Sequence, residues 1–251
     1  MLFLLYINDL PSYVTSSTVA LFADDSKCFK EIRNLDDCAR LQNDIISLCN
    51  WSSLWKLNFN LSKCKVLRLT RSKQPFLYSY DMNGTVLELV NSMLDLGVTV
   101  QSDHKWNEHV LNITARANSM LGFIKRTVGH STSIDCRKAL YVTLVRSVLE
   151  YCSPIWSPGS RMLTKLLEGV QRRATRFILG TGPEHPDYKS RLTSLGMLPL
   201  TFRREAADVL LFVKSLANLY DCDIVKHVSF SLKNLHGRGI IFSRVFGVSF
   251  W

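Results

Sequence analysis

Hydrophobic and polar residues follow two different rhythms along the chain, and the change falls near residue 102. In residues 1–101 most apolar residues form short runs bounded by turn-forming residues, which is typical of β-strands. The exception is residues 34–56, where apolar residues recur at helical spacing after Asn34, a good helix-capping residue. The first part is therefore predicted to combine one long helix with several short strands.

Short apolar runs separated by turns predict two β-hairpins and two further strands in this part. An apolar segment at 1–7 is expected to stop before Pro11, because proline disfavours helical backbone at the preceding residue. The hairpins and strands are expected at 19–22 with 26–30, at 78–82 with 85–89 around the turn Asn83-Gly84, at 66–69 and at 94–100.

From residue 104 onwards apolar residues recur every three or four positions, which is the period of an amphipathic helix. The fold class is therefore predicted to be α+β, with a mixed region at 1–101, a helical bundle at 102–215 and a tail of unknown structure at 216–251. The helices are expected at 106–124, at 140–148 with an end at Pro154, at 163–178 with an end at Gly180, and more weakly at 187–195 and 202–217.

The composition is that of a globular protein with an excess of positive charge. The chain has 251 residues, of which 47% are hydrophobic and 21% charged, so a disordered or collagen-like chain is excluded. The formal net charge is +10. Residues 1–103 are nearly neutral, whereas residues 104–214 carry 17 basic and 8 acidic residues. This basic second part raises the expectation of a polyanionic partner.

Cysteine and hydropathy patterns argue against a secreted or membrane protein. The seven cysteines include no pair at CxxC spacing, so neither a disulfide partner nor a zinc finger is expected. No apolar run reaches the roughly 18 residues of a membrane span. An intracellular protein without membrane contact is predicted, with nucleus and cytoplasm left open.

Asp24 and Asp25 are the clearest candidates for chemistry. Adjacent carboxylates at a tight bend can converge on a hard cation such as Mg²⁺. Two such ions stabilise the attacking and the leaving oxygen in phosphoryl transfer. An isolated Asp-Asp pair is more often a solvated turn, so the surrounding residues decide between these alternatives.

The segment Phe22-Ala23-Asp24-Asp25 resembles motif C, the YxDD block, of reverse transcriptases in its Phe-Ala-Asp-Asp form. Further segments resemble parts of non-LTR (LINE-type, jockey- and CR1-like) retrotransposon enzymes, and they occur in the same order. They are 2–11 (the helix before motif C), 60–64 (motif D), 96–99 (the motif E primer grip), and 149–156, 167–176 and 195–204 (the thumb).

This resemblance implies a partial reverse transcriptase palm of β-hairpins and a helix at 1–101, followed by an all-helical thumb bundle at 102–215. The implied activity is RNA-directed DNA polymerisation with Mg²⁺, deoxynucleotides, an RNA template and a DNA primer. Asp24 would bind the catalytic metal with Asp25 as companion ligand. Lys63 would approach the departing pyrophosphate, and its alternative role is that of a solvated surface lysine.

The primer end would be held by a turn that comprises Leu96, Gly97 and Val98, for which an ordinary buried strand is the alternative. The resemblance also places motif A, with a third metal-binding carboxylate, before motif C. The 23 residues before Asp24 do not contain that motif, and Asp9 is a poor substitute. We therefore expect an incomplete, inactive fragment that uses deoxynucleotides only if the palm is completed.

Lys165, Arg172 and Arg176 fall on one side of the third predicted helix. Cations at this spacing can follow a nucleic-acid backbone without reading its bases. The alternative is a solvated helix face, and Glu168 interrupts the row. Besides a polymerase, the sequence is thus compatible with a non-catalytic nucleic-acid-binding remnant or with a relic that folds poorly.

Overall fold

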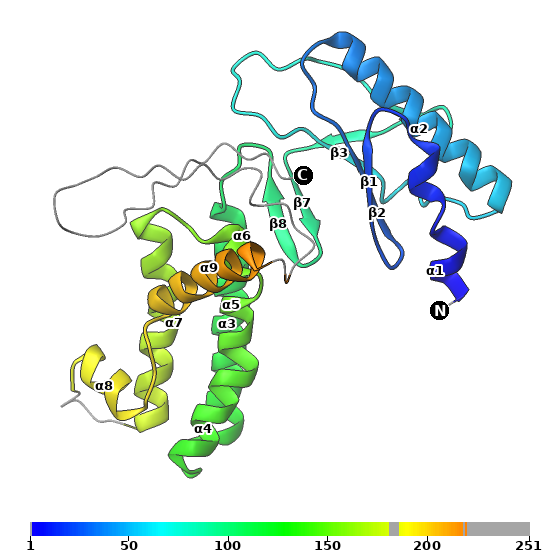
Figure 1. Cartoon of the computed structure of the whole chain (residues 1–251). Coiled ribbons are helices and arrows are strands. Elements are labelled where there is room, and N and C mark those ends of the chain that lie inside the picture. The colour runs from blue at the N-terminus through cyan, green and yellow to red at the C-terminus, as the bar shows by residue number, and fades with distance from the viewer. Residues whose placement is uncertain (1, 181–185, 218, 220–251) are drawn as a thin grey trace. The chain divides into compact units, whose positions relative to one another are not determined.

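The computed structural model describes residues 2–180, 186–217 and 219, and these residues form two compact units (Figure 1). Unit 1 extends to Leu94 and includes Val100–Lys105, whereas unit 2 comprises Asp95–Thr99 and the described residues from Trp106 onwards. Helices and short antiparallel or parallel strand pairs occur together, so the predicted α+β class is confirmed. Apart from residues 216, 217 and 219, the predicted tail lies outside the described residues.

Unit 1 is built around the long helix α2, and its hairpins are short. Its elements in chain order are α1 (Leu2–Ile7), the 3-10 helix η1 (Leu10–Tyr13), β1 (Thr18–Phe22), β2 (Asp25–Phe29), α2 (Leu35–Trp55), β3 (Lys65–Leu67), β4 (Asp81–Met82), β5 (Thr85–Val86) and β6 (Glu88–Val90), followed by the hairpin of β7 (Ser92–Asp95) and β8 (Val98–Gln101) that joins the units.

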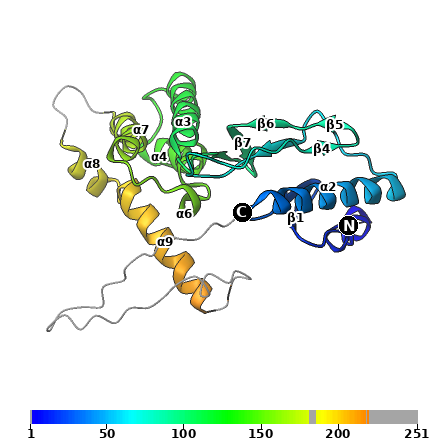
Figure 2. The ribbon, with the colours of Figure 1, turned by 90° about the horizontal axis from the view of Figure 1, so that it is seen from above.

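Helix α2 begins and ends where its sequence provides caps. The Asn34 side chain accepts a hydrogen bond from the Asp37 backbone N–H at 2.9 Å, as the capping pattern predicts. Lys56 adopts a φ of 57° and ends the helix one residue after Trp55. Two sides of the helix are buried: Leu48 and Trp51 pack beside α1 and η1, whereas Cys38, Ile45 and Cys49 pack beside β4. Figure 2 shows α2 with β4 on one side and β1 on the other.

The predicted hairpin at 19–22 with 26–30 is confirmed, whereas the other strand predictions for unit 1 need correction. In the predicted hairpin at 78–82 with 85–89 only β4 and β5 pair, next to the turn, and Glu88–Val90 forms the separate strand β6. Asn83 and Gly84 form the turn between β4 and β5 with φ values of 52° and 75°. The predicted single strand at 94–100 is instead a hairpin, because Leu96 and Gly97 form a turn within it. Strand β3 is shorter than predicted and pairs in parallel with β6.

The first helix, α1, ends at Ile7 and thus before Pro11, as predicted, but a second short helix begins at Leu10. This residue is fully buried and opens η1, with Pro11 in the first turn of that helix. Proline is tolerated there because its missing N–H has no intrahelical acceptor in any case. A new element therefore begins at Leu10, after the predicted end of the first one.

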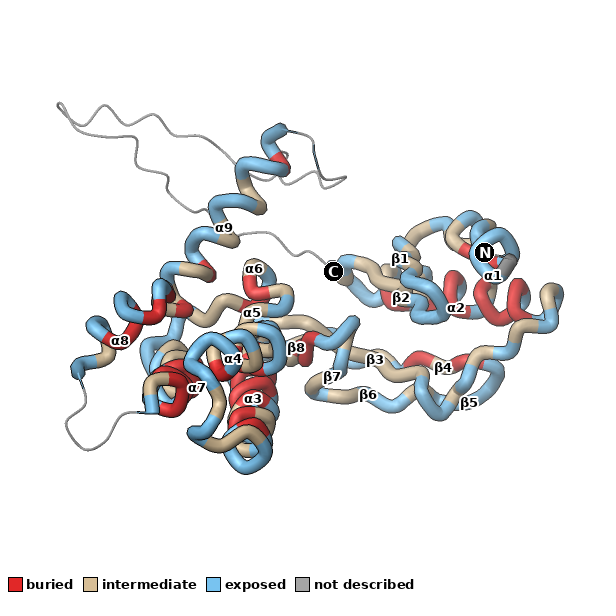
Figure 3. Tube along the Cα trace, turned by 90° about the horizontal axis from the view of Figure 1, so that it is seen from below, coloured by how far each residue is buried: buried red, intermediate tan, exposed pale blue. Residues whose placement is uncertain are grey.

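Unit 2 is helical, and its helices bury their apolar faces against one another (Figure 3). The core is centred on the two longest helices of the unit, residues 107–128 and 161–179, which contribute buried residues such as Val110, Ala117, Leu167 and Ala174. The elements are α3 (Asn107–Val128), α4 (Ile134–Leu140), the π-helix η2 (Tyr141–Arg146), α5 (Ser147–Glu150), α6 (Ser153–Trp156), α7 (Arg161–Leu179), α8 (Tyr188–Ser194) and α9 (Leu200–Leu216).

The second predicted helix requires a correction in this unit. It starts at Ile134 and continues through η2 and α5 to Glu150. The helix ends there, and Cys152, two residues later, has a φ of 52° that changes the direction of the backbone. Pro154 lies in the first turn of the next helix, α6, instead of ending the preceding one. The other helices lie where the periodicity predicts them, and Gly180 ends α7 with a φ of 63°.

Candidate magnesium and nucleic-acid sites

Asp24 and Asp25 lie at the tip of the β1–β2 hairpin. Ala23 and Asp24 form the two-residue turn, with a φ of 52° at Ala23, and Asp25 begins β2 opposite Phe22. Both aspartates are exposed. Within the described part of the chain, neither carboxylate has a hydrogen-bond or ion-pair partner. The hairpin thus presents two carboxylates that are free to accept a ligand.

Two carboxylates suit Mg²⁺, which keeps several waters and is commonly held by one or two carboxylates together with substrate phosphates. Among the residues that the structure describes, no group of three or more His, Cys, Asp or Glu side chains comes together. Asp9 is engaged elsewhere, because its carboxylate accepts a hydrogen bond from the indole N–H of Trp51 at 2.8 Å. Further ligands would have to come from waters, from a substrate or from outside the described residues.

The base of the hairpin is held by Asp44, a residue that sequence reasoning missed. This side chain is only 2% exposed and accepts hydrogen bonds from the backbone N–H and the hydroxyl group of Thr15, Ser16 and Ser17. Burial alone raises the pKa of Asp44, but these hydrogen bonds outweigh burial and lower the pKa far below its usual value. The Thr-Ser-Ser run before a strand was the available sequence signal.

Lys63 lies in the turn that precedes β3. Its backbone N–H donates to the Asn60 carbonyl at 2.9 Å, and the Asn60 side chain accepts from the Ser62 hydroxyl at 2.7 Å. The Lys63 side chain is exposed, and no contact with Asp24 or Asp25 is found among the described residues. Its predicted catalytic role remains a prediction.

Leu96, Gly97 and Val98 differ sharply in their surroundings. The Tyr151 hydroxyl donates to the Leu96 carbonyl at 3.0 Å, and a Cβ added to Gly97 would lie 3.2 Å from the Tyr151 ring. Val98 is 4% exposed and belongs to the core of unit 2. The first two residues therefore form a turn packed on Tyr151, and only Val98 fits the alternative of a buried strand residue.

His109 on α3 holds the strand that follows this turn. Its Nδ1 accepts a hydrogen bond from the Thr99 backbone N–H at 3.1 Å, and its ring meets the Trp156 ring edge-on at 5.0 Å. Burial lowers the pKa of His109. An acceptor at Nδ1 requires the neutral imidazole, so this histidine positions β8 as an uncharged group.

Lys165, Arg172 and Arg176 are all exposed along one side of α7. Arg161, one turn before Lys165, is exposed on the same side and extends the row by one cation. With a rise of about 1.5 Å per residue, the row from Arg161 to Arg176 spans about 22 Å. Val170 and Phe177, on the other side of the helix, are buried, whereas Leu166 is 38% exposed.

Glu168, which interrupts this row in the sequence, is bound by a neighbouring tyrosine. Its carboxylate accepts a hydrogen bond from the Tyr188 hydroxyl on α8. The Arg172 guanidinium lies over the same tyrosine ring, 4.7 Å from its centroid. Tyr188 therefore engages the acidic residue and orients the central cation of the row at the same time.

Comparisons with protein-family models, with curated proteins and with solved structures found no match to this chain. No helix in the described ranges is both long enough and apolar enough to cross a membrane. The cysteines at 28, 38, 49, 64, 136 and 152 are present as free thiols.

Proposed function

We propose that this chain binds a nucleic-acid backbone through the basic face of α7, as the thumb part of a non-LTR retrotransposon reverse transcriptase. The observation that carries the proposal is the exposed row of Lys165, Arg172 and Arg176 on one continuous helix. Arg172 and Arg176, one turn apart, lie about 6 Å apart along the axis, near the spacing of successive phosphates in a strand, and Lys165 lies about 10 Å before Arg172. Contacts of this kind bind without selecting a base sequence.

The surroundings of the row support backbone contact over an ordinary solvated face. The one acidic side chain within the row, Glu168, already accepts a hydrogen bond from Tyr188. Arg172 is held over the Tyr188 ring, which reduces the side-chain entropy lost on binding. The net charge of +9 over residues 104–214 adds a long-range attraction for polyanions.

The binding proposal is tested with the full chain and a fluorescent RNA–DNA primer–template, by anisotropy at several salt concentrations. A variant with Lys165, Arg172 and Arg176 all changed to Gln should flatten the slope of log K against log salt by about 2 to 3, since each lost phosphate contact contributes about 0.7–0.9.

The matched control removes three exposed cations from other helices of unit 2, by changing Arg116, Arg126 and Lys189 to Gln. This control loses the same charge and should keep most of the slope. Equal flattening in both variants would mean that net charge alone drives binding, and it would overturn the assignment to α7.

A second proposed function is nucleotidyl transfer at the β1–β2 hairpin once the palm is completed by a further carboxylate. It is favoured by the two exposed carboxylates of Asp24 and Asp25 at the hairpin tip. Mg²⁺ bound there would stabilise the attacking and leaving oxygens. Asp24 and Asp25 would hold the ion while the primer 3′-hydroxyl gives its proton to water and its oxygen attacks the α-phosphate of a deoxynucleotide. The bond from the α-phosphorus to the bridging oxygen then breaks, and pyrophosphate departs. Lys63 is proposed to donate a proton to that pyrophosphate.

Primer extension on poly(rA)–oligo(dT) with Mg²⁺ tests this second function. Among the described residues only two carboxylates, those of Asp24 and Asp25, lie together at the hairpin tip, so we expect no primer extension by the chain alone. Extension that disappears in the Asp24→Ala, Asp25→Ala variant would show that this chain completes the site. Extension that persists in that variant would remove the hairpin from the reaction.

A further inference from the structure

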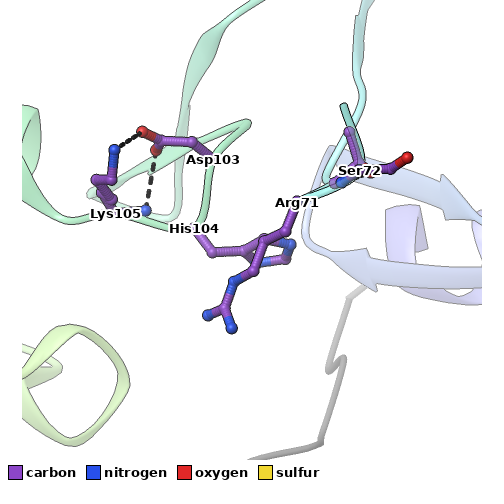
Figure 4. A pocket seen from close by; sticks show the side chains of 6 residues that line it. Arg71, Ser72, Asp103, His104 and Lys105 are labelled. Atoms are coloured by element: carbon purple, nitrogen blue, oxygen red, sulfur yellow. Dashed lines mark hydrogen bonds and ion pairs between the residues drawn. The ribbon is translucent and has the colours of Figure 1, made fainter. Parts of the chain in front are cut away.

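A second basic site lies in unit 1, where two loops line an open pocket of about 440 Å³ (Figure 4). One loop follows β3 and the other follows β8. Neither loop belongs to the β1–β2 hairpin or to α7. The pocket is lined by Thr70, Arg71, Ser72, Asp103, His104 and Lys105.

Backbone hydrogen bonds join the two loops, so the pocket is formed before any ligand arrives. The Thr70 backbone N–H donates to the Ser102 carbonyl at 3.0 Å, and the Ser102 N–H donates to the Asn91 carbonyl at 2.8 Å. The Ser72 N–H donates to the Thr70 hydroxyl oxygen at 3.0 Å, which closes a tight turn next to Arg71. His104 has a φ of 58°, a left-handed conformation that is uncommon for residues other than glycine.

The positive charges of the pocket are only partly balanced. Lys105 pairs with the Asp103 carboxylate at 3.1 Å, and the Lys105 backbone N–H donates to the same carboxylate at 3.0 Å. Arg71 has no hydrogen bond or ion pair within the part of the chain that the structure describes. Its side chain instead extends beside the imidazole of His104 (Figure 4). The pocket thus keeps one uncompensated guanidinium next to a titratable ring.

The electrostatics of His104 agree with this arrangement. Burial lowers the pKa of His104, the positive charge of Arg71 lowers it further, and the Asp103 carboxylate acts in the opposite direction. Two groups that repel each other when both are charged lie side by side. An anion between them would relieve that repulsion and favour the imidazolium form.

We infer that this pocket binds a phosphate group, with Arg71 and His104 as its ligands. The planar guanidinium can donate two parallel hydrogen bonds to phosphate oxygens. Protonated His104 adds a third donor from the adjacent loop, and Lys105 contributes positive charge at the rim. Phosphate monoesters, phosphodiesters in a nucleic-acid backbone and inorganic phosphate all offer the required oxyanion.

Inorganic phosphate titrated into the full chain, with the His104 ring resonances followed by NMR, tests the inference. We expect a saturable change at His104 and a titration midpoint that moves to higher pH when phosphate is bound. Arg71→Gln should weaken phosphate binding by about tenfold or more, as expected for the loss of a charge-assisted hydrogen bond.

Lys73→Gln is the matched control, because Lys73 is an exposed cation on the same loop and does not line the pocket. It should leave phosphate affinity unchanged, and the buried His109 resonances report whether each variant is folded. A folded Arg71→Gln variant with wild-type affinity would overturn the inference. So would the absence of a saturable change at His104.

Two oligonucleotides distinguish the sources of the phosphate. A 5′-phosphorylated oligo(dT) that perturbs His104 more strongly than its 5′-hydroxyl form would identify a terminal phosphate as the ligand. Equal perturbation by both would identify the backbone phosphodiester. The variant lacking Lys165, Arg172 and Arg176 should retain the response to inorganic phosphate, so failure of the α7 proposal and failure of this one are separable.

Discussion

The substitution Asp44→Asn should loosen the hairpin that carries Asp24 and Asp25. Asp44 is the buried acceptor of six hydrogen bonds from three consecutive residues that lead into β1. Asparagine preserves the shape of the side chain but replaces one carboxylate oxygen with an NH₂ group. The NH₂ group would face backbone N–H groups of residues 15–17, which are themselves donors, so at least one of these N–H groups loses its acceptor.

The size of the effect follows from these contacts. An unsatisfied buried donor costs about 1–3 kcal/mol, and hydrogen bonds to a charged group contribute about 1.5–3 kcal/mol each. The six bonds share one carboxylate and are not additive, so the expected loss of stability in unit 1 is about 3 kcal/mol. Where exchange proceeds through opening of this segment, the amides of residues 15–17 should exchange about 100-fold faster.

Hydrogen exchange with mass spectrometry measures this effect, with Asp36→Asn as the control on an exposed position of the same helix. The low pKa of Asp44 means that its stabilisation is present above about pH 4, the pKa of an unfolded aspartate, and is lost as the pH falls further. The difference between wild type and Asp44→Asn should therefore shrink below pH 4. Equal exchange rates in both variants at pH 7 would refute the reasoning.

Two further predictions concern unit 2. Gly97→Ala should lower the free energy of unfolding by about 1–3 kcal/mol, because φ is 85° and the new Cβ would crowd the Tyr151 ring. Gly84→Ala, with a φ of 75° and no atom near the new Cβ, should cost less, and equal losses in thermal unfolding would contradict this. Because burial lowers the pKa of His109, its protonation favours the unfolded state. Urea unfolding should show stability falling below about pH 6.5, with a flatter profile in His109→Gln; identical profiles would be inconsistent with a neutral His109.

The local sequence was sufficient to predict a helix or a hairpin wherever its hydrophobic periodicity or its turn residues lie within that element. In α7, buried residues recur every three or four positions, and Gly180 ends the helix with a positive φ that costs glycine little. The β1–β2 and β4–β5 hairpins follow from turn residues between short apolar runs. Exposure of the row around Arg172 also follows, since a helix with one buried face leaves the other in water.

The chain by itself therefore determined the helices, the tight turns and the residues that they expose, because backbone preferences and hydrophobic periodicity act over a few residues. Tertiary structure alone decided which distant groups meet. Asp44 reached residues 15–17, Tyr188 engaged Glu168, and Arg71 came to lie beside His104 only when their elements packed. Such pairings depend on burial and on chain folding over tens of residues, for which neither composition nor periodicity carries a signal.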